Sequence, residues 1–437
     1  MVAHARHADV NLLEKDVPEA RSSDPAATRV QNFEAAVRRL REGGTEAILQ
    51  AVRALLPNIA ARAGHHDRTG TYPSATFDEL WQAGLTSLSL PVELGGVGAS
   101  FTDTAKALQL IASADGSTAF LLKAHLAGLR DGGRNWPEPL RSDFHKAILE
   151  GPAHRSGSRS DKNGGSAARG GLPRATARLI MQADGKKYWK INAHKAYATG
   201  SVEAGWFGVW AATAPEDGEV LVGTFIVPAD TPGFQVLEGS WDQLGMRATV
   251  SNDLLLEDVV IPYEYAMALS PFGQRNPADA RNAITRTSDW TSGLEAAVYS
   301  GLAIGARDWL VQHLNERIPA SLGKPLSTLP KFQEAVGEIE LLIYNNKLVI
   351  DDISRRIEAN ANGEGEPVTM VEGGLARVKS VRNSLEAIDK AVSLVGNAGL
   401  AYRYPLQRHF RDVLCGRVHE PQAEVLLTHK GKAALGV

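Results

Sequence analysis

The spacing of apolar residues changes twice along the chain. From residue 31 to about residue 150, apolar residues recur at intervals of three and four, which predicts a series of amphipathic helices. Between residues 174 and 262 the interval becomes two, and turn residues separate six such runs, which predicts six β-strands. The helical spacing returns near Thr287 and continues along the rest of the chain. Helices, then strands, then helices indicate an α+β protein that is mainly α.

These changes divide the chain into four segments. Residues 1–30 are polar with scattered charge, so we expect a disordered or loosely docked arm. Residues 31–150 are expected to form an N-terminal helical domain, and residues 151–270 a middle β-barrel or β-sandwich domain. Residues 271–437 hold four long helical patterns, which predict a C-terminal four-helix bundle. The last of these helices is expected to have Pro421 in its first turn.

The middle segment opens with a stretch rich in Gly, Ser and Arg. Residues 151–173 show no apolar periodicity, which predicts a long loop rather than a core element. Loops of this length in a compact domain are usually functional or mobile. We therefore expect a functional or mobile loop here.

Composition limits the partners and the compartment. The chain of 437 residues has a net charge of -3, so no bulk attraction to nucleic acid or to an anionic membrane is expected. No run approaches the ~20 apolar residues that a membrane-spanning helix needs, and the N-terminus does not resemble a signal peptide. Cys415 is the single cysteine, which excludes an intrachain disulfide and suits a reducing compartment. We therefore expect a cytoplasmic protein, and no spacing of histidines and carboxylates predicts a metal site.

Three motifs lie in order along the chain. Residues 88–103 carry a proline-headed run that leads into Gly-Gly-x-Gly, and residues 241–262 carry Gly-x-Arg, alternating Ser and Thr, and a Glu-Asp-Val-x-x-Pro end. Residues 393–420 carry a Gly-x-x-Gly turn, Tyr-Pro, Arg-Asp and then a carboxylate nine residues after the arginine. In content and order these motifs resemble the three signatures of the acyl-CoA dehydrogenase family.

The resemblance implies a flavoenzyme that oxidises a CH–CH bond. Family members bind FAD non-covalently between the β domain and the bundle, and they form dimers or tetramers in which the neighbouring subunit completes the FAD site. Their reaction removes a proton from Cα and a hydride from Cβ of an acyl thioester. For this chain it implies FAD, an acyl-CoA or acyl-carrier thioester as substrate, a homodimer or homotetramer, and electron-transfer flavoprotein or O2 as electron acceptor.

The resemblance also assigns a base for the α-proton. Aligned through Arg411 and Asp412, Glu420 falls where the family places its catalytic carboxylate. A proton next to a thioester carbonyl is very weakly acidic, so its removal needs a positioned base, and a buried carboxylate can serve. A structural alternative is that Glu420 only complements the dipole at the N-terminus of the last helix. Arg411 and Asp412 are expected to form an ion pair that fixes the turn.

The residues around Glu420 depart from the usual family pattern. Dehydrogenases carry an aromatic residue before the glutamate and Gly-Thr after it, whereas this chain has His419 before it and Pro421 and Gln422 after it. A His-acid-Pro turn at this place resembles the flavin-dependent monooxygenases that share the fold, which use reduced flavin and O2. A third hypothesis is a flavin-binding or acyl-carrier-binding protein without catalysis.

Some family members place the base on the first bundle helix instead. The matching position in this chain is Thr291, which offers no carboxylate. Glu295 lies one turn further along and is interpreted as an ordinary helix residue.

The resemblance implies a group of flavin-binding residues in the β domain. Tyr197 takes the place of the tryptophan that covers the flavin ring, and Thr199 that of the hydroxyl that approaches flavin N5. Ser156 and Ser158, in the glycine-rich stretch, match what is kept of the family's other flavin strand. The alternative for Tyr197 and Thr199 is a core aromatic residue and a turn residue.

Further flavin contacts are expected from the bundle. Arg317 and Gln333 resemble residues that reach the pyrophosphate and adenine of the neighbouring subunit's FAD, although the spacing here is longer. The turn with Gly396 and Asn397 would let its backbone approach phosphate closely. Gln422 matches a position that touches the flavin. These assignments come from the resemblance alone.

Overall fold

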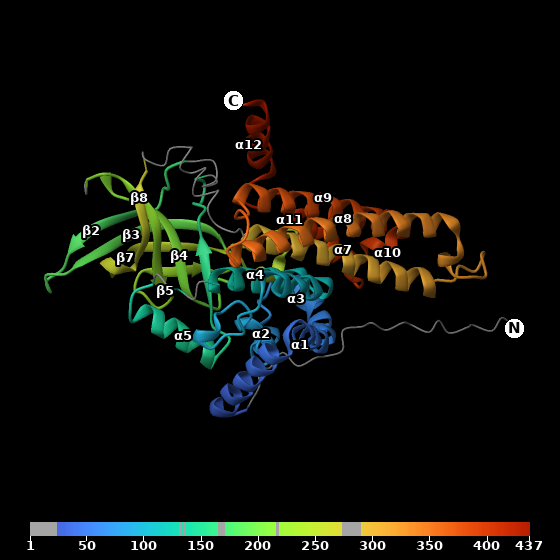
Figure 1. Ribbon diagram of the computed structural model, residues 1–437, viewed down its shortest axis with the longest axis horizontal. Helices are drawn as coiled ribbons and strands as arrows, with labels where there is room; N and C mark the ends of the chain where they lie inside the picture. The colour runs from blue at the N-terminus through green and yellow to red at the C-terminus, as the bar shows by residue number, and fades with distance from the viewer. Residues whose placement is uncertain (1–23, 131–132, 134–135, 165–170, 216–217, 273–289) are drawn as a thin grey trace.

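The computed structural model describes residues 24–437 apart from 131–132, 134–135, 165–170, 216–217 and 273–289. A helical part, a sheet and a helical bundle follow one another along the chain, and the helical part lies below the other two in Figure 1. The predicted fold class is confirmed. The boundaries of the four segments remain predictions, and residues 1–23 of the predicted arm lie outside the described residues. No helix in the described part of the chain has the length and hydropathy of a membrane span.

The N-terminal part consists of helices. They are α1 (Ala26–Thr69), α2 (Ser74–Gln82), α3 (Phe101–Ala114), α4 (Gly116–Leu129) and α5 (Leu140–Glu150). Asp115 separates α3 from α4 and caps α4, because its carboxylate accepts the backbone N–H of Thr118 at 2.8 Å. Buried residues occur all round α4, which packs against both α3 and the first helix of the bundle. This helix therefore lies between the two helical parts of the protein.

The middle part is one sheet, with eight strands among the described residues. They are β1 (His154–Ser158), β2 (Thr176–Met181), β3 (Lys187–Ala198), β4 (Ala204–Thr213), β5 (Leu221–Pro228), β6 (Phe234–Leu237), β7 (Asn252–Pro262) and β8 (Ala266–Pro271). The strands pair in the order β6-β7-β3-β2-β4-β5-β8, and β1 pairs with β4 in parallel. The six strands predicted from the sequence correspond to β2 through β7.

The prediction of a loop throughout residues 151–173 is wrong at β1. Its side chains His154, Ser156 and Ser158 are buried, while the residues between them are more exposed. This alternation is that of a half-buried strand. Because the buried residues are polar, apolar periodicity could not reveal the strand.

The C-terminal part is a bundle of helices. They are α7 (Trp290–Glu316), α8 (Pro330–Ala361), α9 (Met370–Val395) and α11 (Pro405–Cys415), with the short α10 (Asn397–Leu400) before α11. The sequence predicted that the last helix, α12 (Ala423–Leu435), is the fourth helix of the bundle, and this prediction is wrong. It is α11 that packs against α7 and α9, with Leu406 and Val413 in the core. Helix α12 projects from the bundle (Figure 1), and Leu426 is its one buried residue.

A buried joint connects the three parts. Arg411 on α11 donates to both carboxylate oxygens of Asp67 on α1. Asp412 accepts the backbone N–H of Met246, from the sheet part, at 2.6 Å. Gly245 lies against the α11 backbone, where a Cβ atom would be 2.2 Å from the carbonyl oxygen of Arg411. The predicted ion pair between Arg411 and Asp412 is therefore wrong, because each side chain binds a different part of the protein.

The protonation of Asp412 predicts a pH dependence of stability. Burial, and then the charge of Asp115, raise the pKa of Asp412 from 3.8 to about 7. Between these values the folded chain holds a proton that the unfolded chain has released, so this group lowers the free energy of unfolding as pH rises. Asp412→Asn keeps an oxygen that can accept the N–H of Met246, but its side chain does not titrate. The variant should therefore not show this decrease in the free energy of unfolding, which is on the order of 3 kcal/mol at about pH 8.

Urea unfolding at about pH 5 and about pH 8 measures the effect, because the two values bracket most of the titration. The exposed Asp389 on α9 gives a matched control, since Asp389→Asn should leave the pH dependence unchanged. If the difference in the free energy of unfolding between Asp412→Asn and the wild type is the same at both pH values, Asp412 is not the group responsible.

Candidate functional site

The turn between α11 and α12 carries the predicted base. Glu420 is half-buried, and α12 begins at Ala423, so Pro421 precedes this helix instead of lying in its first turn. Arg377 on α9 donates to the carbonyl oxygen of Glu420 at 3.0 Å and to that of Pro421. Burial lowers the pKa of Lys195 on β3, and the Glu420 carboxylate is near enough to oppose that shift. The turn therefore lies where the bundle meets the sheet (Figure 1).

His419 is packed between the N-terminal part and the bundle. Its ring stacks on Phe120 of α4, with centroids 4.8 Å apart and an interplanar angle of 13°. Its Nε2 atom is hydrogen-bonded to the hydroxyl of Tyr299 on α7. Burial lowers the pKa of His419 to about 4, although the charge of Glu295 acts in the opposite direction. The imidazole is therefore uncharged at neutral pH and acts as a hydrogen-bonding group rather than as a cation.

A buried ion cluster of Lys123, Glu295 and Arg377 lies next to His419. Glu295 on α7 accepts from Lys123 of α4 at 2.6 Å and from Arg377 at 3.0 Å. Burial alone would raise the pKa of Glu295, but the charges of Lys123 and Arg377 outweigh it and lower this pKa to about 2. Glu295 is thus ionised and a poor proton acceptor. Its interpretation as an ordinary helix residue is wrong, because its carboxylate connects three helices.

Sequence reasoning misses the partners of this cluster, although a signal for them exists. Lys123 is the single charged residue of α4, and Glu295 is the single charge in the first half of α7. Charged residues are almost never fully buried unless they are paired. Two isolated charges of opposite sign in two apolar helices therefore indicate a buried pair. No comparable signal marks Arg377, since α9 carries many charges.

Three predicted flavin residues meet at the end of β3. Ser156 and Ser158 on β1 donate to the carbonyl oxygens of Thr199 and Ala196, at 2.8 and 3.0 Å. The hydroxyl of Ser251 donates to Thr199 Oγ1 at 3.1 Å. Because a hydroxyl both accepts and donates, the O–H of Thr199 can still donate to a ligand. The serines of β1 thus hold the backbone on which Thr199 lies.

The groups around this strand end and the turn fit a flavin. Tyr197 is 60% exposed, with an uncommon left-handed backbone at φ 66°. Its ring lies edge-on to Trp241, with centroids 6.3 Å apart. In the turn, Gln422 Oε1 is buried and has no hydrogen-bond partner among the described residues. An exposed aromatic face, the Thr199 hydroxyl and an unsatisfied amide oxygen match the planar ring and polar edge of an isoalloxazine.

The other predicted flavin residues lie at the opposite end of the bundle. Arg317 follows α7, Gln333 lies in the first turn of α8, and Gly396 and Asn397 follow α9. Successive bundle helices run in opposite directions, so these positions lie at the end away from Glu420 (Figure 1). All four residues are exposed. A single chain does not bring them together with the residues at the end of β3.

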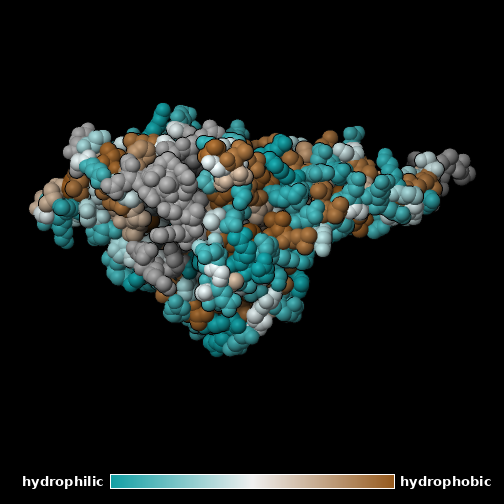
Figure 2. Space-filling view, turned by 45° about the horizontal axis from the view of Figure 1, so that its top comes forward, coloured by the Kyte–Doolittle hydropathy of each residue, from teal (hydrophilic) through white to brown (hydrophobic). Residues whose placement is uncertain are grey.

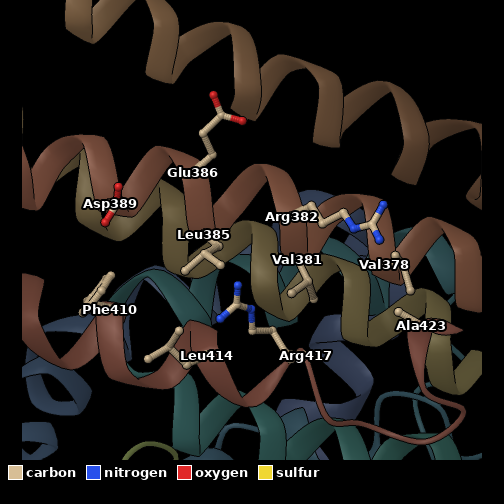
Figure 3. Close-up of a pocket in the computed structure, with 11 residues that line it drawn as sticks. Val378, Val381, Arg382, Leu385, Glu386, Asp389, Phe410, Leu414, Arg417 and Ala423 are labelled. Atoms are coloured by element: carbon tan, nitrogen blue, oxygen red, sulfur yellow. The ribbon is translucent and has the colours of Figure 1, made fainter.

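The bundle surface also has a groove between α9 and α11, with a volume of about 620 Å³. Figure 3 shows Arg382 and Leu385 on the α9 side and Phe410 and Leu414 on the α11 side. Arg377 lies on the buried face of α9. The groove is therefore separate from the ion cluster.

Helices, sheet and bundle, with flavin-compatible groups where they meet, fit a flavin-dependent oxidoreductase. Sequence profiles of the acyl-CoA dehydrogenase N-terminal, middle and C-terminal domains match residues 44–130, 159–259 and 294–423. The chain is 31% identical over 370 residues to the putative acyl-CoA dehydrogenase YdbM of Bacillus subtilis, covering 84% of this chain and 91% of that protein. The chain belongs to the acyl-CoA dehydrogenase family.

Other similar proteins carry different names. The amino sugar nitrososynthase RubN8 of Streptomyces rubradiris is 29% identical, over 86% of this chain and 86% of its own. The structure of KijD3 in complex with dTDP has a TM-score of 0.74 at 26% identity and covers 96% of this chain and 99% of that chain. A second KijD3 structure contains FMN and a dTDP-linked amino sugar, with a TM-score of 0.68 at 26% identity, covering 96% of each chain. These similarities support a flavin cofactor.

The hydrogen bond between Tyr299 and His419 predicts a stability effect. Tyr299→Phe leaves Nε2 of His419 without this partner, so the free energy of unfolding should fall by about 1–3 kcal/mol. Urea unfolding at neutral pH measures the loss. Tyr263→Phe in the sheet part is the matched control, because its side chain is 45% exposed and the change should affect stability little. Equal losses in the two variants would show that the buried hydrogen bond contributes nothing.

Proposed function

We propose that this chain is a flavin-dependent monooxygenase, which uses reduced flavin and O2 to transfer one oxygen atom to its substrate. The observation that carries the proposal is the half-buried, uncharged His419, stacked on Phe120 and hydrogen-bonded to Tyr299 beside the place where a dehydrogenase needs a base. The buried carboxylate next to it, Glu295, is bound to two cations and is too weakly basic to take up an α-proton. An oxygenation needs no such base.

The chain's own residues would bind the flavin and keep water from it. Tyr197 would stack on the ring, Thr199 would donate to a ring nitrogen, and Gln422 would accept from the ring edge through Oε1. A bound flavin supplies two-electron redox chemistry and, once reduced, the reaction with O2. His419, stacked on Phe120, would offer a hydrogen bond near the reacting oxygen without adding charge. Overall, the reduced flavin would supply two electrons, and two protons would be taken up. One oxygen atom of O2 would then be transferred to the substrate and the other would become water.

Two relatives make a polar amine the first substrate class to test. RubN8 is named as an amino sugar nitrososynthase, and KijD3 has been solved with FMN and a dTDP-linked amino sugar. In this chain, the Lys123–Glu295–Arg377 cluster places buried charges beside His419. An apolar acyl chain gains little from lying against charged groups. We therefore propose a polar, amine-bearing substrate.

A second candidate is α,β-dehydrogenation of an acyl-CoA or acyl-carrier thioester, with hydride transfer to FAD N5. Glu420 favours it, because this carboxylate is half-buried in the turn where the family places its base. The Bacillus subtilis relative is named as a putative acyl-CoA dehydrogenase. In this reaction Glu420 would remove the α-proton, and electron-transfer flavoprotein or O2 would reoxidise the flavin.

Variants at adjacent positions separate the two candidates. With reduced FMN or FAD, isotope-labelled O2 and a panel of primary amines that includes dTDP-linked amino sugars, the wild type should add one labelled oxygen atom to a substrate. His419→Asn should lower the yield on the order of 100-fold, because a positioned hydrogen-bonding group is lost. Glu420→Gln should retain most of the yield. Mass spectrometry of the products is the measurement.

Anaerobic mixing with a panel of acyl-CoAs tests the dehydrogenase candidate. Flavin bleaching that Glu420→Gln abolishes and His419→Asn preserves would overturn the monooxygenase proposal. A purified protein that takes up neither FMN nor FAD would instead support the non-catalytic hypothesis.

We further propose a homodimer or homotetramer in which each subunit completes its neighbour's flavin site. Arg317 and Gln333, at the end of the bundle away from Glu420, would reach the pyrophosphate and adenine of a neighbour's FAD. Helix α8 exposes Leu341, Tyr344 and Leu348 on one face, at 60%, 56% and 49%. Figure 2 shows hydrophobic residues interrupting the hydrophilic surface along the bundle. An apolar stripe of this kind is typical of an interface.

The same arrangement bears on the cofactor and the compartment. Contacts from a neighbour to the adenine half favour FAD, whereas the groups at β3 and the turn would suffice for FMN.

The single cysteine, Cys415, is not in a disulfide, and burial raises the pKa of its thiol to about 12, so it is unreactive. We propose FAD as the cofactor and the cytoplasm as the location.

Tyr344→Glu tests the interface and the cofactor together. A buried carboxylate in the interface should dissociate the oligomer, and light scattering after size-exclusion chromatography measures the mass. Dissociation should weaken FAD binding on the order of tenfold or more and leave FMN binding unchanged. Lys331→Glu, an exposed α8 position off this stripe, is the control. An oligomer that survives Tyr344→Glu, or equal losses of FMN and FAD, would contradict the proposal.

A further inference from the structure

We propose that Arg377 is a positioning residue: held by Glu295, it fixes the turn that carries His419 and Glu420. The assignment rests on the proposed function only in so far as this turn belongs to the flavin site. Neither Arg377 nor Glu295 lies within the three motifs, at residues 88–103, 241–262 and 393–420.

The guanidinium of Arg377 has contacts in two directions. It is 1% exposed and donates to Glu295 at 3.0 Å on one side. On the other side it donates to the carbonyl oxygens of two consecutive residues, Glu420 at 3.0 Å and Pro421. A planar, rigid fork of donors fixes the orientation of what it binds more closely than a single hydrogen bond does. The backbone after His419 therefore has a defined position relative to α9.

The same cluster sets the side chain of His419. Glu295 binds Lys123, and the Lys123 ammonium lies 4.2 Å from the centroid of the Phe120 ring. That ring stacks on His419, whose other contact, Tyr299, lies one turn after Glu295 on α7. One buried ion cluster thus orders both the imidazole and the backbone that follows it.

The turn is exposed to solvent on its outer side. Val418 is 72% exposed and Arg417 is also exposed. Downstream, α12 projects and buries only Leu426. Arg377 thus ties the backbone of residues 420 and 421 to α9 from the inner side.

The shape of the guanidinium, rather than its charge, explains why this position is an arginine. Glu295 is shared between two cations, so replacing Arg377 by lysine keeps the charge balance of the buried cluster. A lysine ammonium, however, is a point charge and cannot donate to Glu295 and to both carbonyl oxygens in one plane. Arg377→Lys should therefore fold while it releases the turn.

Hydrogen exchange on the full-length protein without added flavin is the first measurement. In Arg377→Lys, peptides that cover residues 416–424 should exchange on the order of tenfold faster than in the wild type. Peptides from α4 and α7 should be unchanged. Arg382→Lys, on the same helix but facing the groove, is the matched control and should exchange as the wild type does.

Titration of His419 by NMR is the second measurement, with His419→Asn to assign its signal. Burial lowers the pKa of His419 to about 4, so a released turn should raise it toward 6.5, by roughly one unit or more. Arg382→Lys should not move it. If Arg377→Lys leaves both the exchange and the titration as in the wild type, Arg377 does not position the turn.

A double variant tests the role of Glu295. Glu295→Gln together with Lys123→Met removes one charge of each sign, so the net charge of the cluster is kept. Faster exchange of residues 416–424 in this variant supports the proposal that Glu295 holds Arg377. Wild-type exchange there would overturn it. Neither measurement uses flavin or substrate, so a failure of the monooxygenase proposal would leave these outcomes unaffected.

Discussion

The burial of three charged side chains constrains the centre of this protein. Lys123, Glu295 and Arg377 come from three helices, and each side chain is at most 7% exposed. A buried charge that loses its partner is strongly destabilising, so α4, α7 and α9 must keep the spacing that joins these groups. Because Arg377 also binds the backbone before α12, the same constraint decides where His419 lies. The packing of the three helices therefore also determines the geometry of the site.

A second joint places the sheet against both helical parts, and it explains what the family motifs do. Arg411 binds the Asp67 carboxylate, Arg247 donates to the Asp67 carbonyl oxygen at 2.7 Å, and Gly245 admits the α11 backbone. The most recognisable residues of the middle and C-terminal motifs are thus residues that hold domains together. These contacts between domains are compatible with any reaction at the flavin. Membership in the family therefore does not determine which reaction the protein catalyses.

Periodicity predicted the elements whose buried face is apolar and failed where burial is polar or partial. It gave β2 to β7 but missed β1, whose inward side chains are His154, Ser156 and Ser158. It chose α12 for the bundle because of its length, although length does not measure burial. Resemblance to the family gave the candidates Glu420, Tyr197 and Thr199. It did not give the ion cluster, whose members lie 172 and 82 positions apart and meet only in the folded chain.

The choice between the two reactions depends on which buried group can hold a proton near neutral pH. A carboxylate does so when burial raises its pKa and no cation opposes the shift. At this centre the buried carboxylate, Glu295, faces two cations, and His419, half-buried in the turn, is uncharged. Glu420, the remaining carboxylate, is also half-buried and lies toward Lys195 on the sheet. The centre thus offers hydrogen bonds rather than a strong base, which suits the reaction of reduced flavin with O2 better than the removal of an α-proton.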